Sequence, residues 1–265
     1  MNKYLSMLKN RLAVGLEYRS NIFGQFIIDL ISLIATIIFW NAVFKTQNNL
    51  SSYSLNDSVL YFFITPLTGA LTYIFVSDEL GNEIRMGAMS NYLLKPYSLQ
   101  FEALTRALAS KLNNFLTTIP FYSILIVCIS VFANHFMVTL PSLLLFILAV
   151  FMGFALHFVF DLTIAYCAFW VGEVWAFTHF KKVIFLIFGG LMFPLDFLPS
   201  SLFSIFSLLP FQYMYYIPNT YLLGKRTISH IPHDIFLFVF WFVALLLIQR
   251  FVWKKGLMQY EAQGG

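Results

Sequence analysis

Long apolar runs, separated by short polar segments, make up most of the chain. A helix needs roughly 20 apolar residues to cross the core of a bilayer. The candidate runs cover residues 22–44, 58–77, 107–132, 140–170, 180–209 and 232–253. This pattern predicts an all-α integral membrane protein with six transmembrane helices in a single domain over residues 1–265.

The first 20 residues follow an amphipathic pattern. Leucines recur at helical spacing and polar residues fall on the opposite side, with Leu5, Leu8, Leu12 and Leu16 facing away from Lys3, Asn10 and Glu17. Such a stripe predicts an interfacial helix over residues 1–20 that lies along the inner leaflet. The alternative is a disordered tail.

Prolines interrupt the fifth apolar run. They stand at Pro194, Pro199, Pro210 and Pro218. Because an interior proline removes a backbone hydrogen bond and clashes with the preceding turn, a straight helix is excluded. We expect a broken fifth span followed by short helices that dip into the outer leaflet, or else a surface loop. Nearby aromatic residues predict an interfacial belt, formed by Phe211, Tyr213, Tyr215, Tyr216 and Tyr221.

Composition and charge agree with a membrane protein. Hydrophobic residues make up 60% of the chain and charged residues 11%, which excludes a water-soluble globule. The basic residues lie at the ends of apolar runs, so the modest net charge of +4 does not indicate nucleic-acid binding. If the amino terminus is cytoplasmic, only Lys45, Lys225 and Arg226 of the 16 basic residues fall outside. This asymmetry predicts that both termini are cytoplasmic.

Familiar catalytic and nucleotide-binding motifs are missing from the sequence. It has no Walker A, HExxH, CxxC, GxSxG or EF-hand pattern. Cys128 and Cys167 both lie in apolar runs, where a thiol acts as a small hydrophobe. We therefore expect a chain that is not an enzyme and carries no metal or cofactor. An enzyme that acts on membrane lipids lacks a visible nucleophile, base and metal site.

Ionisable residues fall inside two predicted spans: Asp29 in the first, and His157 and Asp161 in the fourth. Charge at membrane depth is costly and marks a functional hypothesis. His157 and Asp161 share one helix face, which Gly153 and Ala149 continue towards a close helix contact. They form either a proton relay or polar lining, or a hydrogen-bonded pair that joins helices. Asp29 lies near the inner interface, where a partly solvated role is favoured.

A polar segment over residues 78–106 follows the second predicted span. It is too polar for the bilayer and too short for a domain. It predicts one short helix at the membrane surface, stopped by Pro96. An apolar face on that helix would seat in a partner's groove. Its apolar residues are Met86, Met89, Leu93 and Leu94, with Glu83, Arg85 and Lys95 at the rim.

Four stretches carry a resemblance to a known family: "MNKYLSMLKNRLAVGLEYRSNIFGQFIIDLI", "IRMGAMSNYLLKPYSLQF", "FWVGEVWAFTHFKKVIFLIFGGLMFPLDFLPSSL" and "FVWKKGLMQYEAQGG". Through them the chain resembles a permease subunit of the type-2 exporter class of ABC (ATP-binding cassette) transporters. Within that class it is similar to a bacterial group of six-span permeases.

The resemblance implies that the polar segment contains the coupling helix that docks on an ATPase. That role would fall to residues 81–96, with the coupling residues Glu83, Arg85, Met86, Gly87, Leu93, Leu94, Lys95 and Pro96. It implies two cytoplasmic ATPase subunits, which bind ATP and Mg²⁺, and a second permease that is identical or related. The chain would export an amphiphilic or hydrophobic substrate across a bacterial plasma membrane.

Two other functions stay open from the sequence. A secondary transporter could be driven by protons through Asp29, His157 and Asp161. Alternatively, the chain could be a structural or regulatory membrane subunit that transports nothing itself.

Overall fold

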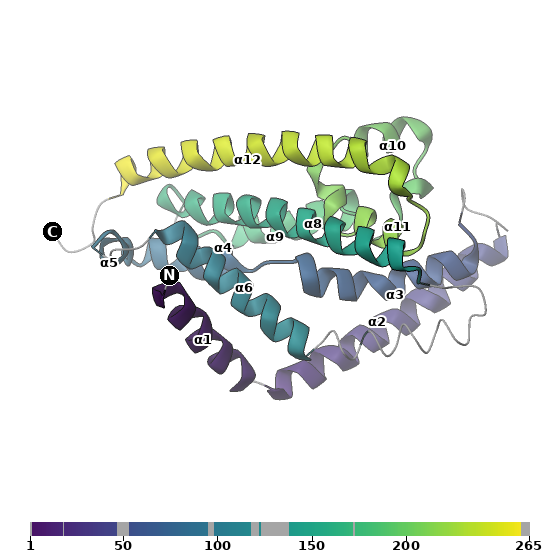
Figure 1. Ribbon diagram of the computed structural model, residues 1–265, viewed down its shortest axis with the longest axis horizontal. Helices are drawn as coiled ribbons and strands as arrows, with labels where there is room; N and C mark the ends of the chain where they lie inside the picture. Colours follow the sequence, from purple (N-terminus) through teal and green to yellow (C-terminus); the bar gives the residue numbers. More distant parts are fainter. Residues whose placement is uncertain are drawn as a thin grey trace.

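The computed structural model describes residues 2–17, 19–46, 53–94, 98–117, 122, 138–171 and 173–260. These residues form helices and turns, without a β-strand (Figure 1). The α-helices are α1 (Asn2–Glu17), α2 (Arg19–Thr46), α3 (Leu55–Thr72), α4 (Val76–Arg85), α5 (Met89–Leu93), α6 (Leu99–Thr117), α8 (Leu140–Tyr166), α9 (Trp175–Phe188), α10 (Ser200–Phe206), α11 (Tyr216–Leu222) and α12 (Ile231–Gln259). The 3-10 helices are η1 (Cys167–Phe169), η2 (Leu195–Phe197), η3 (Pro210–Tyr213) and η4 (Ile228–His230).

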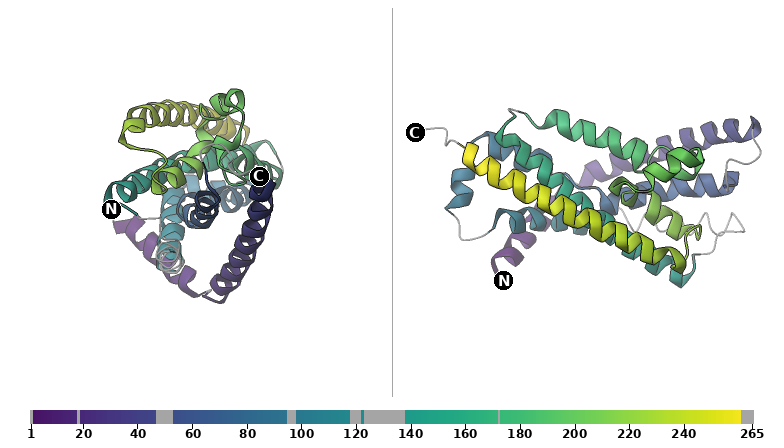
Figure 2. Two further views of the ribbon diagram at one scale, coloured as in Figure 1. Left: turned by 90° about the vertical axis from the view of Figure 1, so that its right-hand side faces the viewer. Right: turned by 90° about the horizontal axis from the view of Figure 1, so that it is seen from above.

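The long helix α8 forms the centre of the packing. It contacts α12, α11 and α4, and α1 lies along α6 (Figures 1 and 2). The start of α1, helix α5 and the end of α12 lie at one end of the molecule, and α10 lies at the other. Because α1 packs on α6, it is part of the folded protein. Its predicted place along the membrane surface stays a prediction.

Three helical stretches of the described residues are long and apolar enough to cross a membrane. They cover Leu55–Arg85, Leu140–Phe169 and Ile228–Gln259, and α2 contains a shorter apolar helix, Ile34–Lys45. Helix α9 has only 14 residues, fewer than a straight span requires. Much of the predicted third span, residues 107–132, lies outside the described residues. The six-span arrangement therefore stays a prediction.

The fifth apolar run is divided into short helices. Helix α9 ends at Phe188, and Gly190 follows in a left-handed conformation with φ of 84°. Pro199 stands immediately before α10, and Pro210 is the first residue of η3. Both positions suit proline, because the first backbone N–H groups of a helix have no partner inside that helix. Pro199 and Pro210 thus mark the starts of new helices in this region.

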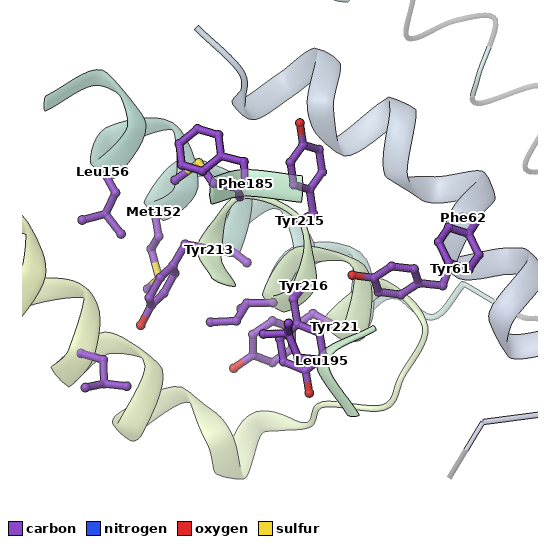
Figure 3. Packing of buried hydrophobic residues seen from close by; sticks show 14 of the residues in the cluster. Tyr61, Phe62, Met152, Leu156, Phe185, Leu195, Tyr213, Tyr215, Tyr216 and Tyr221 are labelled. Atoms are coloured by element: carbon purple, nitrogen blue, oxygen red, sulfur yellow. The ribbon is translucent and has the colours of Figure 1, made fainter. Parts of the chain in front are cut away.

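The prediction of an aromatic belt at the membrane interface is wrong for its tyrosines. All four tyrosines of the predicted belt are at most 5% exposed and lie in the central apolar cluster, namely Tyr213, Tyr215, Tyr216 and Tyr221 (Figure 3). The hydroxyl of Tyr213 donates to the backbone carbonyl of Asp234. The hydroxyl of Tyr221 donates to the Asp234 carboxylate at 2.7 Å. Buried tyrosines need such acceptors for their polar tips, and internal partners here replace interfacial water.

Gly153 allows α8 to approach another part of the backbone closely, as its spacing from Ala149 predicts. A Cβ atom at position 153 would lie 2.3 Å from the carbonyl oxygen of Tyr213. Because a backbone atom cannot move aside easily, we expect Gly153→Ala to destabilise the fold by about 2 kcal/mol. Thermal unfolding in detergent micelles measures this effect.

Gly24→Ala is the matched control for that measurement. A Cβ atom at position 24 would meet nothing within 4 Å. Alanine is favoured over glycine inside a helix by up to about 1 kcal/mol, so this variant should be neutral or slightly stabilised. Equal melting temperatures for the two variants would contradict the close contact at Gly153.

Candidate functional site

The stretch Leu55–Arg85, which is long and apolar enough to cross a membrane, is broken in its middle. Helix α3 ends at Thr72 and α4 begins at Val76, so residues 73–75 are not helical. These residues contain neither proline nor glycine. The break must therefore be held by groups elsewhere in the fold, because backbone N–H and C=O groups at membrane depth need partners.

Two basic side chains supply donors to the carbonyl groups at the break. The Lys111 amine on α6 donates to the carbonyl oxygen of Ala70 at 3.0 Å and to that of Tyr73. The Lys181 amine on α9 donates to the carbonyl oxygen of Ile74 at 3.3 Å. These are carbonyl groups that the interrupted helix leaves without their usual partners.

Two residues of α8 bind the other side of the break. The backbone N–H of Ile74 donates to Nδ1 of His157 at 3.2 Å. The same Nδ1 also lies 3.1 Å from the carbonyl oxygen of Thr72, so the tautomer of the ring decides which of the two contacts is a hydrogen bond. The backbone N–H of Ser77 donates to the Asp161 carboxylate at 2.9 Å, and its hydroxyl donates to the same carboxylate at 2.7 Å.

Asp161 and Lys181 form a buried ion pair. The Lys181 amine donates to Oδ1 of Asp161, and the side chains are 0% and 1% exposed. A buried charge is stable only when it is paired and its remaining hydrogen bonds are made. We call Lys111, His157, Asp161 and Lys181 the polar clasp, because together they hold residues 73–77 in place.

The polar clasp bears on the two roles predicted for His157 and Asp161. The two residues share one face of α8, as their spacing predicts, but each bonds to the break between α3 and α4. This arrangement favours the role of joining helices over a proton relay. The charge pattern counted Lys181 among the basic residues of the inner side, and the structure buries its side chain beside Asp161. The side chain of Asp29, on α2, lies outside the described part of the structure.

The polar segment contains the end of α4, all of α5 and the start of α6, in place of the single helix predicted. Helix α4 runs to Arg85, a turn follows at residues 86–88, and α5 covers Met89–Leu93. Gly87 allows the turn, because its φ of 75° is a conformation that other residues rarely adopt. Lys95 and Pro96 lie outside the described residues, as does the side chain of Leu93.

The predicted apolar face of the polar segment is divided between the interior and the surface. Met89 is buried in the apolar cluster that includes Leu80 and Ile84. Met86 and Leu94 are exposed, at 69% and 84%. These two side chains therefore flank α5 as free apolar groups.

Arg106, on α6 at the end of the polar segment, forms hydrogen bonds with residues of α4 and α5. Its Nε donates to the Glu102 carboxylate at 2.7 Å, and its Nη atoms donate to the Glu83 carboxylate at 2.9 Å. It also donates to the Tyr92 hydroxyl at 2.6 Å, and that hydroxyl donates to Glu83 at 2.8 Å. The side chain of Glu83 is thus half-buried against Arg106 and Tyr92. The same network reaches α1, because Arg11 pairs with Glu79 at 2.7 Å.

The charge of Arg106 is stabilised by its neighbours. Burial by itself would lower the pKa of the guanidinium group, but its hydrogen bonds to the Glu83 and Glu102 carboxylates raise that pKa above the ordinary value. Arg106 is therefore a permanent cation that joins α4, α5 and α6.

Arg106→Gln should loosen this support, because Glu83 and Glu102 lose a charged donor. Hydrogen bonds to charged groups contribute roughly 1.5–3 kcal/mol, and we expect a loss of about 2 kcal/mol in unfolding free energy. Chemical unfolding in detergent, followed by circular dichroism, measures it. Arg85→Gln is the control, since its ion pair with Glu173 at 3.1 Å is exposed and should contribute at most about 1 kcal/mol. A larger loss in the control would contradict this assignment.

Comparison with known proteins matches one family. The model of the family described as ABC-2 family transporter protein matches residues 30–264. That range contains both the polar clasp and the polar segment. No curated protein matches the chain significantly.

Proposed function

Because this chain belongs to the ABC-2 family of transporter proteins, we propose that it is the membrane subunit of an ABC exporter. It is a transmembrane permease, and ATP would be hydrolysed on separate ATPase subunits that bind ATP and Mg²⁺. Transport would be outward, across a bacterial plasma membrane, with both termini in the cytoplasm.

The observation that carries the proposal is the exposed end of the polar segment. Met86 and Leu94 offer apolar side chains to a partner, and Arg85 lies beside them. A docking surface of this kind works best on a rigid base, since ordering a loop on binding costs free energy. Arg106 provides this rigidity through its bonds to Glu83 and Tyr92, and Met89 provides it by packing in the buried apolar cluster.

Closure of the ATPases around ATP would push on this surface. Helix α4 continues from the polar segment to the polar clasp, which joins it to α6, α8 and α9. A displacement of the segment would therefore move several membrane helices together, in a rocking motion. In this scheme the ion pair of Asp161 and Lys181 joins helices to one another.

The complex would contain two ATPase subunits and two permeases, either identical or related. Cargo would pass between the permeases. The aromatic and apolar composition of the chain supports an amphiphilic or hydrophobic substrate.

Cysteine labelling tests the orientation on which the proposal depends. In a background with Cys128 and Cys167 replaced by serine, we expect Leu94→Cys to react with a membrane-impermeant maleimide only after cells are permeabilised. Ser229 is also exposed and lies just before α12, near the opposite end from α5. Ser229→Cys should react in intact cells. The reverse pattern would remove the ATPase-docking role of the polar segment.

A further inference from the structure

The last described residue of the chain binds the turn of the polar segment. Tyr260 follows α12, and its hydroxyl donates to the carbonyl oxygen of Gly87 at 2.6 Å. The same hydroxyl oxygen accepts the backbone N–H of Ser90 at 3.2 Å and lies 3.0 Å from the Ser90 hydroxyl. A phenol has one donor and can accept two hydrogen bonds, so Ser90 is the donor in the last contact.

These bonds satisfy groups that the turn itself leaves open. Ser90 is the second residue of α5, where a backbone N–H has no partner within its own helix. Gly87 is the residue with positive φ between α4 and α5. Tyr260 therefore joins both sides of the turn from outside the polar segment.

Tyr260 is itself fixed to the end of α12 and its neighbours. Its ring contacts the ring of Phe169 at a centroid distance of 6.1 Å. Phe169 in turn packs on α12, because a Cβ atom at Gly256 would lie 2.2 Å from its ring. A movement of Gly87 and Ser90 thus reaches α12 through tightly packed groups.

We propose that Tyr260 is a positioning residue that transmits displacement of the polar segment directly to α12. This inference rests on the proposed function. Helices α4 and α6 are covalently continuous with the polar segment, whereas α12 is distant in sequence and, besides its packing on α8, meets the turn through Tyr260. Removing the hydroxyl should uncouple α12 while the docking surface at Met86 and Leu94 stays in place.

The first experiment tests whether the hydroxyl holds the turn. Hydrogen exchange of residues 86–92 is compared between the unaltered chain and Tyr260→Phe in lipid nanodiscs. Loss of a hydrogen bond with a net value of about 1 kcal/mol should speed exchange there roughly fivefold. Tyr166→Phe is the matched control, because Tyr166 lies in the same apolar cluster without a hydrogen bond to the turn among the described residues.

The second experiment tests transmission to α12. Spin labels are placed at Lys254→Cys on α12 or Ser110→Cys on α6, both exposed positions, in the cysteine-free background. The full permease and its ATPase are assembled in nanodiscs, and spectra are recorded with and without ATP. With Tyr260→Phe we expect the ATP-dependent change at position 254 to fall at least about fivefold, while the change at position 110 persists. A role limited to stability would not separate the two labels.

The outcomes separate this inference from the proposed function. If both labels respond to ATP in Tyr260→Phe as in the unaltered chain, Tyr260 does not transmit the displacement, although the proposed function stands. If no ATPase binds the unaltered chain, or neither label responds, the proposed function fails and the inference fails with it.

Should Tyr260→Phe not fold, Ser90→Ala removes one of the three contacts and should reduce the response at position 254 in part. An unchanged response in Ser90→Ala would then overturn the inference.

Discussion

Replacing Lys181 by methionine is expected to destabilise the folded chain by about 3–5 kcal/mol, the usual cost of leaving one member of a buried ion pair without its partner. Asp161 would stay in the interior with only Ser77 as a donor. The carbonyl group of Ile74 would also lose the Lys181 amine. Unfolding by denaturant in detergent micelles, followed by tryptophan fluorescence, measures the loss.

A second substitution should restore much of this stability. In Lys181→Met with Asp161→Asn, both members of the ion pair lose their charge together, and the asparagine side chain can still accept from Ser77. Replacing a buried ion pair by groups without charge is often nearly neutral. Lys182→Met is the control at the neighbouring exposed position and should change stability by less than about 0.5 kcal/mol. If the double variant were less stable than Lys181→Met alone, the ion pair would not explain the effect.

The same double variant decides between two functions. A proton-driven transporter needs Asp161 to gain and lose a proton, so it would lose transport when Asp161 becomes asparagine. In the ABC exporter that we propose, Asp161 only joins helices. ATP hydrolysis by the assembled complex should then survive in the double variant.

The sequence predicted the parts of the fold that follow from local chemistry. Prolines predicted the division of the fifth apolar run, since an interior proline removes a backbone hydrogen bond and clashes with the preceding turn. Gly153 and Ala149 predicted a close contact of α8, because small residues on one face allow it. The family match agrees with the resemblance that the four stretches carry.

Other features depend on partners that are distant in sequence. The break at residues 73–75 has no proline or glycine, and its cause lies on α6, α8 and α9. Lys181 looks like an ordinary basic residue at a membrane boundary until Asp161 is placed beside it. One signal was present, because an aspartate at membrane depth needs a cation. Tyr213 and Tyr221 follow the same logic, as the hydroxyl groups of both donate to Asp234.

Replacing Met86 and Leu94 together by aspartate is expected to abolish binding of the ATPase. Both side chains are exposed and apolar, and both flank α5. Truncating an anchor residue at the centre of an interface commonly costs about 2 kcal/mol or more, which corresponds to roughly a 30-fold change in Kd. Charge at two such positions should therefore weaken binding by about 1,000-fold. Copurification from membranes, followed by a titration of the purified ATPase, measures the loss.

Folding should survive this double substitution, because the exposed side chains of Met86 and Leu94 contribute little to the core. Met258→Asp is the matched control, since Met258 is 66% exposed near the end of α12, at the same end of the molecule as α5. It should bind the ATPase like the unaltered chain. If Met258→Asp abolished binding as fully as the double substitution, added negative charge and not the apolar surface would be the cause. If the double variant still bound the ATPase, the polar segment would not be the docking site, and the coupling route through Tyr260 would lose its starting point.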